Sequence, residues 1–398
     1  MIDNALILAG GKGKRCWPLT ENNSKVLLPV VGIPIIIHQI NRFKNIGVKN
    51  IFIVVDHESS DVIPIVESYG IKNVVFIYQK KQLGTGHAIS KARKHISGYF
   101  YCLNADTLIS ESYFELIKDM NDQPFISVKY KDNCSNYGFV EMKKDSFQSI
   151  QEKSVNKPGY VNAGLFLFSE NIFNAIDKIK KSSRGEYEIT DALRLIKDEL
   201  TVKVIDGYCQ DIGYPWDLLN ANEKYIQGIE NINHGKIEIN VSINGKLFLG
   251  DNSLIKSGVY IEGPVWIGKY CSIGPNSFLR PGTILCGNNK IGASCEIKNS
   301  IIFDGANIPH HNYIGDSIIG EGCNFGAGTK TANVRHDKKK IRVNYRNSIQ
   351  NTGRKKFGVI MGDNVNMGIN CSINPGTLIE NNTNIMPGKM ISGIIKAT

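Results

Sequence analysis

The sequence lacks the patterns that mark several large classes of protein. Across 398 residues, no stretch approaches the roughly 18 consecutive apolar residues that span a bilayer, and the amino terminus has neither the basic start nor the long apolar core of a signal peptide. None of the nine cysteines forms a C-x-x-C pair, so neither a zinc site nor a disulfide framework is indicated. We therefore expect a cytoplasmic protein without a membrane partner, whose cysteines are free thiols in a reducing compartment.

Two common phosphate-binding patterns are also missing. The chain has no G-x-x-x-x-G-K-[ST] string, and its first glycine cluster does not have the G-x-G-x-x-G spacing of dinucleotide-binding proteins. The formal net charge is +10, but the densest basic clusters, residues 338–342 and 354–356, are not interleaved with aromatic residues on which bases could stack. Nucleic acid is therefore not an expected partner. The clusters form either a solvated loop or a surface for a phosphate-rich small ligand such as coenzyme A.

The first 228 residues alternate β-rich runs with amphipathic segments of helix length. Strands are expected at Ala5–Ala9, Ile51–Val55, Val74–Tyr78, Tyr99–Leu103 and Phe125–Tyr130. Helices are expected at Pro34–Ile46, Ser60–Tyr69, Gly86–His95 and Ser110–Met120. This order predicts a three-layer α/β domain around a mostly parallel sheet.

A six-residue period replaces the helical signal after about residue 236. Apolar residues recur in one phase at Ile243, Leu249, Ile255, Ile261, Ile267, Ile273, Leu279, Leu285, Ile291, Ile297 and Phe303, and again at Met361, Met367, Ile373, Ile379, Ile385 and Ile391. Repeats of six residues, each with one buried aliphatic side chain, predict a triangular parallel β-helix in which each repeat forms one face and three repeats form one turn, here called a rung. A chain of this length is also expected to form two or three domains. We place the boundary between residues 228 and 229.

A glycine cluster followed by two cations comes directly after the first expected strand. Gly10 and Gly11 let backbone N–H groups approach phosphates, and Arg15 and Lys25 supply charge to stabilise a triphosphate under attack. The pieces Leu8–Arg15, Pro18–Thr20 and Lys25–Val30 together resemble the signature of the sugar-1-phosphate nucleotidylyltransferases. Ser24 stands where that family usually has proline, which predicts a looser turn before Lys25.

Further motifs extend this resemblance. The segment Gln79–Ala88 looks like the base-reading element of the uridylyltransferases, in which an amide side chain bonds the pyrimidine edge, and this favours UTP. By resemblance, Arg15 and Lys25 are catalytic, and the nucleotide contacts are Leu8, Gly10, Gly11, Gln79, Gly84 and Thr85. The resemblance also implies sugar contacts at Gly138, Glu152 and Asn162, and a Mg²⁺ site at Asp106 and Asp211. Two carboxylates completed by phosphate oxygens and water suit that ion.

Polar residues interrupt the six-residue repeat at several points. The interval of eighteen residues between Arg280 and Lys298 places them one rung apart on the same face. The polar residues resemble those of the acetyltransferase half of the bifunctional N-acetylglucosamine-1-phosphate uridylyltransferases, and an insertion at residues 334–358 looks like that of the archaeal-type enzymes. The resemblance implies a general base at His310, acetyl-acceptor contacts at Arg280, Lys298, Tyr313, Asn324 and Asn333, and acetyl-CoA contacts at Ala327 and Ile369. Neighbouring strand residues point to opposite sides, so only one of His310 and His311 is expected to face the site, and the register, twelve residues after Lys298, favours His310.

The resemblance covers essentially the whole chain. It implies a Rossmann-like three-layer nucleotidyltransferase domain at residues 1–228, followed by a left-handed parallel β-helix at residues 229–398 that assembles as a homotrimer. The implied reactions are acetylation of glucosamine 1-phosphate, or galactosamine 1-phosphate, by acetyl-CoA, and Mg²⁺-dependent transfer of UMP from UTP to the product.

Two other functions stay open. One is a monofunctional glucose- or mannose-1-phosphate nucleotidylyltransferase whose β-helix serves only to oligomerise. The other is a non-catalytic subunit like those of the translation-initiation exchange factor, which share this architecture. The presence of Arg15, Lys25, Asp106 and Asp211 argues against the second of these.

Overall fold

The structure is a computed structural model that describes residues 2–11, 13–56, 61–120, 123–152, 155–345 and 348–397. Contacts between residues divide the chain into two compact units. The first unit comprises Met1–Lys12, Asn23–Leu27 and Pro34–Ile212, and the second comprises Gly13–Asn22, Leu28–Ile33 and Gly213–Thr398. The second unit therefore includes part of the N-terminal motif as well as the C-terminal repeat.

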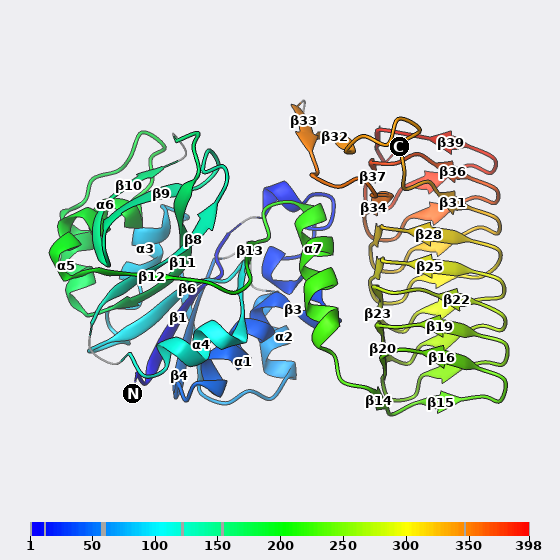
Figure 1. Ribbon diagram of the computed structural model, residues 1–398, viewed down its shortest axis with the longest axis horizontal. Coiled ribbons are helices and arrows are strands. Elements are labelled where there is room, and N and C mark those ends of the chain that lie inside the picture. Colours follow the sequence, from blue (N-terminus) through cyan, green and yellow to red (C-terminus); the bar gives the residue numbers. More distant parts are fainter. Residues whose placement is uncertain are drawn as a thin grey trace. The chain divides into compact units, whose positions relative to one another are not determined.

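The first unit is built around a nine-stranded mixed sheet with the order β5-β4-β1-β6-β11-β8-β12-β10-β9 (Figure 1). Its strands are β1 (Asn4–Leu8), β4 (Asn50–Val55), β5 (Val74–Tyr78), β6 (Phe100–Asn104), β8 (Phe125–Lys131), β9 (Gly138–Lys143), β10 (Ser146–Glu152), β11 (Gly159–Phe168) and β12 (Thr201–Val204). The five expected strands are present, each within two residues of its predicted ends.

The expectation of a mostly parallel sheet is wrong beyond β6, where β12 pairs with β8 in parallel but the other pairings are antiparallel. Strands β5, β4, β1 and β6 are parallel, but β11 runs antiparallel to both β6 and β8, and β9 and β10 form an antiparallel pair. Only two residues separate β9 from β10, and a connection this short joins antiparallel neighbours, whereas parallel strands need a crossover.

Helices cover both faces of this sheet. They are α1 (Ile35–Asn45), α2 (Val62–Ser68), α3 (Thr85–Ser90), α4 (Glu111–Ile117), α5 (Asn171–Lys178) and α6 (Ile189–Leu195). Phe43 of α1 packs against Tyr101 of β6 and Phe114 of α4, with ring centroids 5.7 and 5.3 Å apart. The opposite side of β6 joins the core formed with α3, α5 and α6, because successive strand residues face opposite sides. Ser60, where the second helix was expected to begin, lies outside the described residues.

The second unit contains a left-handed parallel β-helix with three sheets, here called the first, second and third faces (Figure 1). The first face is β14 (Ile232–Asn233), β17 (Leu247–Leu249), β20 (Val265–Lys269), β23 (Thr283–Gly287), β26 (Ile301–Ile302), β29 (Ile318–Ile319), β34 (Val359–Met361), β37 (Thr377–Ile379) and β40 (Ile394–Ile395). The second face is β15 (Lys236–Ile237), β18 (Leu254–Ile255), β21 (Ser272–Ile273), β24 (Lys290–Ile291), β27 (Asn307–Ile308), β30 (Asn324–Phe325), β35 (Asn366–Met367) and β38 (Asn384–Ile385). The third face is β16 (Ser242–Asn244), β19 (Tyr260–Glu262), β22 (Phe278–Leu279), β25 (Glu296–Lys298), β28 (Tyr313–Gly315), β31 (Lys330–Thr331), β36 (Ser372–Ile373) and β39 (Met390–Ile391).

The predicted ladder of aliphatic residues forms the core of the β-helix, with one error of phase. Leu249 pairs with Ile267 and Ile267 with Leu285, so these full turns take 18 residues. The next partner of Leu285 is Ile302 rather than Phe303, because this turn has 17 residues. Ile302 therefore occupies the inward position that was assigned to Phe303. Ile243 is also less protected than predicted: it is 41% exposed, because its rung is stacked on one side only.

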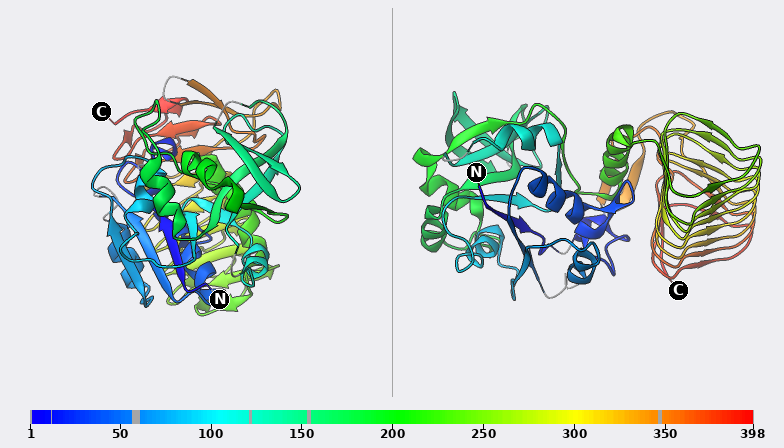
Figure 2. Two further views of the ribbon diagram at one scale, coloured as in Figure 1. Left: turned by 90° about the vertical axis from the view of Figure 1, so that its left-hand side faces the viewer. Right: turned by 90° about the horizontal axis from the view of Figure 1, so that it is seen from below.

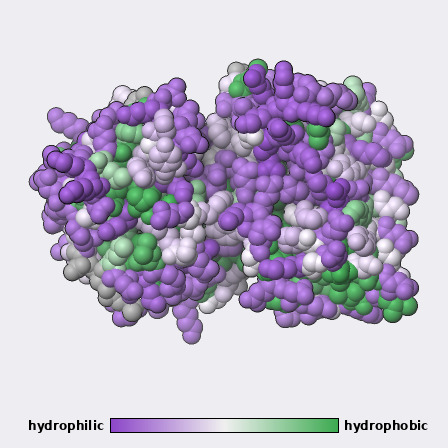
Figure 3. All heavy atoms as spheres, in the orientation of Figure 1, coloured by the Kyte–Doolittle hydropathy of each residue, from purple (hydrophilic) through white to green (hydrophobic). Residues whose placement is uncertain are grey.

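The turns of the β-helix superimpose when the stack is seen nearly end-on, as in the right-hand view of Figure 2. Hydrophilic side chains cover most of its visible face in Figure 3, and apolar ones gather toward the first rungs. All nine cysteines lie in described parts of the chain and are free thiols, as predicted. In the described residues, no helix combines the length and apolar character needed to cross a bilayer.

The second unit also has elements outside the repeat. They include a 3-10 helix in the N-terminal motif, η1 (Lys14–Cys16), the short strand β2 (Pro29–Val30), the helix α7 (Pro215–Tyr225) with its extension η4 (Ile226–Gly228), and a hairpin of β32 (Arg342–Tyr345) and β33 (Ser348–Asn351). The hairpin lies inside the insertion at residues 334–358. The β-helix continues beneath it, because Thr331 pairs directly with Ile373.

Candidate active sites

The carboxyl end of β1 carries the glycine cluster of the first unit. Leu8 ends the strand, and its carbonyl accepts a hydrogen bond from Ala105 N at 3.1 Å. A Cβ on Gly10 would lie 3.4 Å from Gln79 Oε1, whereas a Cβ on Gly11 would meet nothing within 4 Å. Gly10 thus lies close against the segment assigned to the nucleobase, and Gly11 presents its backbone to open space.

Lys25 begins the 3-10 helix η2 (Lys25–Leu27) and forms an ion pair with Asp106. The residue is 7% exposed, so its ammonium group is largely removed from water and depends on this partner. A buried ammonium without a partner would cost several kcal/mol or would lose its proton. The pairing therefore fixes the Lys25 ammonium group next to the assigned metal ligand.

Asp106 and Asp211 come together through a small sheet. Strand β7 (Thr107–Ile109) pairs with β13 (Cys209–Asp211) so that Asp211 lies opposite Thr107, and Ile212 N donates to Asp106 O at 3.0 Å. Two carboxylates from adjacent strand ends provide hard oxygen donors and leave room for phosphate oxygens and water, which fits the coordination that Mg²⁺ prefers. The side chain of Asp106 is part-exposed, so it can reach a ligand.

The turn before Lys25 is anchored, contrary to the looseness expected from Ser24. The Ser24 backbone N–H donates to Asp61 Oδ2 at 2.7 Å, and its hydroxyl donates to Asp61 Oδ1 at 2.5 Å. Proline has no N–H group and no hydroxyl, so it could make neither bond. The serine therefore replaces the rigidity of proline with two hydrogen bonds to one carboxylate.

Gln79 is buried and held by two acceptors. Its Nε2 donates to His87 Nδ1 at 2.8 Å and contacts Gly84 O at 3.3 Å, so the amide is oriented. Burial, followed by the charge of Lys91, lowers the pKa of His87, which favours the neutral ring that can accept this bond. Sequence reasoning gave no role to His87, although it lies within the quoted motif. The fixed spacing of eight residues from Gln79 was the available signal.

The turn around Gly84 requires glycine. Its φ is +97°, and a Cβ would lie 2.6 Å from Tyr187 O. Thr85, which follows, begins α3 and accepts a bond from Ile189 N at 3.1 Å. A second missed contact involves Gln82, whose Nε2 donates to Gly10 O at 2.9 Å and to the buried Asp56. These bonds tie the base-reading segment to the glycine cluster.

The three assigned sugar contacts lie on β9, β10 and β11. Gly138 pairs with Glu152, and a Cβ on Gly138 would approach Glu152 Oε1 to 3.0 Å. Asn162 Oδ1 accepts from Gly164 N at 2.9 Å. Gly164 itself has φ +73°, and a Cβ there would lie 2.6 Å from Asn104 Nδ2. Close packing against Glu152 explains Gly138, and close packing together with a left-handed backbone explains Gly164.

Arg15 lies in the segment 13–22, which belongs to the second unit. Its guanidinium carbon lies 5.6 Å from the centroid of the Tyr214 ring, within the range of a cation–π contact. Tyr214 in turn stacks on Trp216 with centroids 4.7 Å apart. Arg15 is exposed and therefore available to an anionic ligand.

In the β-helix, the predicted stacking of Arg280 and Lys298 is present. Each follows a paired residue, Leu279 and Ile297, so the two cations occupy equivalent positions one rung apart. Both are neutralised within the chain: Arg280 pairs with Glu296 at 2.8 Å and Lys298 pairs with Asp316 at 2.9 Å. Sequence reasoning missed these two carboxylates. A phosphate that bound here would compete with them for the cations.

Tyr313 and Asn333 complete the polar group on the third face. Asn333 Nδ2 donates to Tyr313 Oη at 3.2 Å and to Asp316 Oδ2 at 2.5 Å. Burial, followed by the nearby charge of Asp316, raises the pKa of Tyr313, so its hydroxyl keeps a proton that it can donate to a ligand. A Cβ on Gly315 would lie 2.6 Å from Tyr313 Oη and 2.7 Å from Asn333 Nδ2, so this cluster needs a glycine beneath it.

His310 lies in the turn between β27 and β28, as does His311. The argument that chose between them by strand alternation therefore does not apply, since neither is on a strand. His311 has φ +52°, and both side chains are exposed. The same corner carries Ala327 and Ile369 on higher rungs: Gly328 N donates to His310 O at 3.1 Å, and Asn370 N donates to Ala327 O at 2.8 Å.

Asn324 lies on a different face from the other acetyl-acceptor residues. It belongs to the second face, where its Oδ1 accepts from Asn307 Nδ2 at 2.8 Å. Tyr313 and Lys298 belong to the third face. Within one chain, the structure thus gathers Arg280, Lys298, Tyr313 and Asn333, and leaves Asn324 apart.

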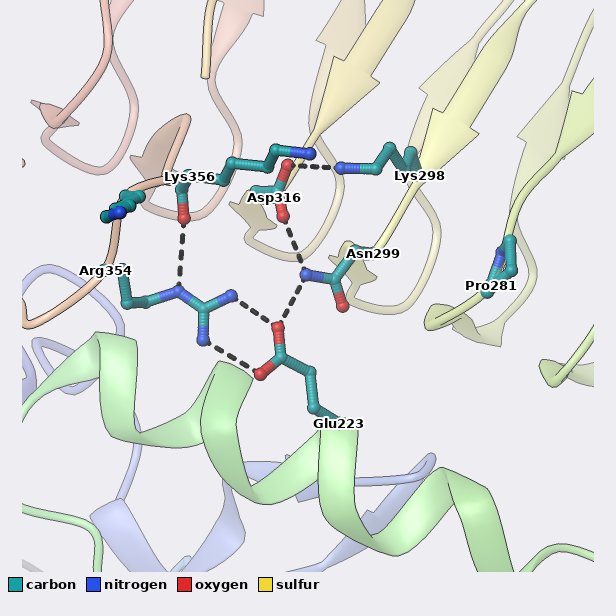
Figure 4. A pocket seen from close by; sticks show the side chains of 8 residues that line it. Glu223, Pro281, Lys298, Asn299, Asp316, Arg354 and Lys356 are labelled. Carbon is teal, nitrogen blue, oxygen red and sulfur yellow. Dashed lines mark hydrogen bonds and ion pairs between the residues drawn. The ribbon is translucent and has the colours of Figure 1, made fainter. Parts of the chain in front are cut away.

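Two cavities adjoin the basic clusters. One, of about 490 Å³, is lined by Glu223, Pro281, Lys298, Asn299, Asp316, Arg354, Lys355 and Lys356 (Figure 4). In it, Asn299 Nδ2 donates to Asp316 Oδ1 at 2.8 Å and to Glu223 Oε1 at 2.7 Å, and Arg354 pairs with Glu223. The other, of about 460 Å³, is lined by Arg335, Asp337, Lys339, Lys340, Arg342 and Asn351.

Known proteins match both halves of the chain. The model of the family described as nucleotidyl transferase matches residues 4–228, and that of the GMPPB C-terminal domain matches residues 261–352. A bifunctional protein GlmU of Methanococcus maripaludis is 39% identical over 401 residues, which covers 99% of this chain and 95% of the relative. A bifunctional sugar-1-phosphate nucleotidylyltransferase/acetyltransferase of Sulfurisphaera tokodaii is 37% identical and covers 98% of this chain and 97% of its own.

Solved structures support the same relationship for part of the chain. A crystal structure assigned as a glucose-1-phosphate thymidylyltransferase from Bacillus anthracis has a TM-score of 0.51 and 26% identity, and the match covers 58% of this chain and 97% of that one. The resemblance inferred from the motifs is thus confirmed over nearly the full length. The chain belongs to the nucleotidyl transferase family, in the group of the archaeal bifunctional nucleotidylyltransferase/acetyltransferases.

Proposed function

We propose that the chain is a bifunctional enzyme that acetylates glucosamine 1-phosphate, or its galactosamine epimer, with acetyl-CoA and then transfers UMP from UTP to the N-acetylated product. Its substrates are small anionic molecules, and its place of action is the cytoplasm. The nine free cysteines support a reducing compartment. The functional boundary is put between residues 228 and 229, since the first rung begins at β14 soon afterwards.

In nucleotidyl transfer, an oxygen of the sugar phosphate attacks the α-phosphorus of UTP, the bond to the β-phosphate oxygen breaks, and pyrophosphate leaves. Arg15 and Lys25 stabilise the charge of the triphosphate, and the backbone of Gly10 and Gly11 accommodates its phosphates. Gln79 reads the uracil edge. Asp106 and Asp211 would hold Mg²⁺, which supplies charge neutralisation on the phosphates when bound. Gly138, Glu152 and Asn162 would contact the sugar.

In acetyl transfer, the amine of the acceptor attacks the thioester carbonyl, a C–N bond forms, and the C–S bond breaks to release coenzyme A. His310 takes the proton that the amine loses as the bond forms. Arg280, Lys298 and Tyr313 bind the sugar phosphate, and Asn333 orients the acceptor. Ala327 and Ile369 lie on the corner above His310 and would contact acetyl-CoA.

A homotrimer would complete the acetyl site. Asn324 and the cluster of Arg280, Lys298 and Tyr313 occupy different faces of the same β-helix, so one chain does not bring them to one ligand. Three copies around a threefold axis would set the second face of one copy beside the third face of the next. Sedimentation of the full chain at several concentrations tests this, and a monomer that retains acetyl transfer would refute it.

The observation that carries the bifunctional proposal is the gathering of Arg280, Lys298, Tyr313 and Asn333 on adjacent rungs. A β-helix that served only as a spacer has no need of two cations and a protonated phenol on one face. The decisive experiment crosses four nucleoside triphosphates with a panel of sugar 1-phosphates, with and without acetyl-CoA, and measures pyrophosphate and free thiol together. Pyrophosphate without thiol for either amino sugar would establish the monofunctional alternative.

A further inference from the structure

The insertion at residues 334–358 contacts the segment that carries Arg15. At the tip of β32, Tyr345 donates a hydrogen bond from its hydroxyl to the carbonyl of Lys14 at 2.7 Å. Its ring meets that of Trp17 edge-on, with centroids 6.3 Å apart. One side chain of the insertion thus contacts the residues immediately before and two positions after Arg15.

The same tyrosine also contacts the ring on which Arg15 rests. Tyr345 meets Tyr214 edge-on at 6.1 Å between centroids, and the Arg15 guanidinium lies over that Tyr214 ring. Tyr214 stacks on Trp216, which in turn meets Phe357 at the other end of the insertion. Trp17, Tyr214, Trp216, Tyr345 and Phe357 form what we call the aromatic cluster. It contacts the backbone of Lys14, next to Arg15, and the side chain of Arg15 itself.

The insertion is itself fixed to the β-helix, so it can act as a support. Ile341 and Val343 are buried, and a Cβ on Gly376 would lie 2.9 Å from Ile341 Cγ2. On the other side, Arg354 bonds Glu223 of α7, with Nη1 3.1 Å from Oε2. Tyr345 is 3% exposed. The exposed Arg15 therefore sits on a segment whose position depends on a buried residue more than 300 positions away.

We propose that Tyr345 is a positioning residue for nucleotidyl transfer, acting by holding the Arg15 segment in its productive geometry. The inference rests on the role of Arg15 in the proposed function. It also gives the insertion, which interrupts the β-helix, a role in nucleotidyl transfer. A misplacement of about 1 Å in a group that acts on the transition state can reduce the rate by about 100-fold.

The test compares three variants of the full chain in both assays. Tyr345→Phe keeps the ring and loses the hydroxyl, Tyr345→Ala loses both, and Ile349→Ala alters a 70% exposed residue on the same hairpin as a control. For nucleotidyl transfer, kcat should fall about 10- to 100-fold in Tyr345→Ala and about 2- to 5-fold in Tyr345→Phe, because only part of the restraint is lost. Acetyl transfer should stay within about twofold of wild type in all three.

A double-mutant cycle separates positioning from general stability. In an Arg15→Lys background, Tyr345→Ala should cause little further loss, since both changes act through one group and their effects should not multiply. Multiplied losses, an equal fall of both activities, or a Tyr345→Ala variant within twofold of wild type would each overturn the inference. If Tyr345→Ala does not fold, Tyr345→Phe and the same cycle decide. A wild-type chain that releases no pyrophosphate would instead overturn the proposed function, and this inference with it.

Discussion

The proposed nucleotidyl site and the proposed acetyl site are assembled in different ways by the same chain. Residues of the first come from the ends of strands and from loops spread over nearly 200 positions, and each is fixed by its own partner, as Lys25 is by Asp106 and Gln79 by His87. Residues of the proposed acetyl site recur every 17 or 18 positions on stacked rungs, as Arg280 and Lys298 do. In a repeat fold, spacing alone places side chains. In a mixed sheet, long-range packing does so.

The comparison implies that the two sites can be damaged separately. A residue of the first unit that is held by one buried partner should be sensitive to removal of that partner, whereas a residue on a rung keeps its place as long as the ladder below it is intact. The following substitutions test that separation, in order of expected effect.

Asp106→Ala should reduce nucleotidyl transfer by at least about 10³-fold, because it removes the proposed metal ligand and the ion pair with Lys25. Acetyl transfer should be unchanged. Pyrophosphate release and thiol release from one preparation measure both. Asp198→Ala, in the exposed 3-10 helix η3 (Lys197–Glu199), is the matched control and should leave both activities at the wild-type level. Wild-type pyrophosphate release by Asp106→Ala would refute the metal assignment.

His310→Ala should lower acetyl transfer by about 10² to 10⁴-fold, the usual worth of a positioned base, and leave nucleotidyl transfer intact. The control is His311→Asn, since asparagine tolerates the positive φ at this position where alanine would add strain. Thiol release from acetyl-CoA measures the effect. If His311→Asn loses the activity and His310→Ala keeps it, the base is the second histidine of the turn.

Gln79→Ala should weaken UTP binding by about 1 to 3 kcal/mol, or about 5- to 150-fold, because the uracil edge and His87 lose a buried partner. Selectivity among the four nucleotides should fall with it. Gln82→Ala offers a contrast: it removes the hydrogen bonds to Gly10 O and Asp56 that tie the base-reading segment to the glycine cluster, so it should slow transfer from every nucleotide alike. Unchanged UTP selectivity in Gln79→Ala would show that the base is read elsewhere.

Lower pH should weaken UTP binding through His87. Its pKa is lowered from the ordinary 6.5, chiefly by burial, so the ring is neutral above that value and its contribution to stability is lost as the pH falls through the folded pKa. A protonated Nδ1 cannot accept from Gln79. The KM for UTP should therefore rise several-fold between about pH 7 and about pH 5, and Gln79→Ala should flatten this rise. An identical pH profile in that variant would contradict the link.

The smallest expected effect concerns the acetyl site. Glu296→Gln keeps the side-chain shape but removes the charge that pairs with Arg280, which leaves the guanidinium freer to bind the acceptor phosphate. Because both side chains are about one third exposed, the gain should be below about 1 kcal/mol, so the KM for glucosamine 1-phosphate should fall about two- to fivefold. Glu230→Gln, at an exposed position just before β14, serves as the control. A higher KM would mean that Glu296 itself binds the acceptor.

The sequence predicted those features that depend on local pattern. The ladder from Leu249 to Ile297 was correct because one kind of residue recurs at a constant period, and it failed at Phe303 because one turn is a residue shorter. The stacking of Arg280 below Lys298 followed from the same period. The alternation argument does not apply to His310 and His311, since both lie in a turn and not on a strand.

Features that depend on distant contacts could not be predicted. Strand β11 lies antiparallel between β6 and β8. Packing against these neighbours, and not the residues of β11 alone, decides this placement. The pairings of Glu296 with Arg280 and of Asp316 with Lys298 are different: they span 16 and 18 residues, about one turn of the β-helix, so the repeat period was a signal that could have found them. The contact of Tyr345 with Lys14 spans 331 positions and leaves no trace in either local sequence.

The insertion leaves and re-enters the β-helix at almost the same point. Phe357 N donates to Asn333 O at 2.9 Å, and Thr331 still stacks beneath Ile373. A segment whose two ends meet can be lengthened at little entropic cost, about 0.6 kcal/mol for each doubling of its length. The insertion can therefore be replaced by another segment without disturbing the stacking of the β-helix. Such a replacement would change the support of the Arg15 segment, and with it nucleotidyl transfer, while the rungs that carry the proposed acetyl site stay the same.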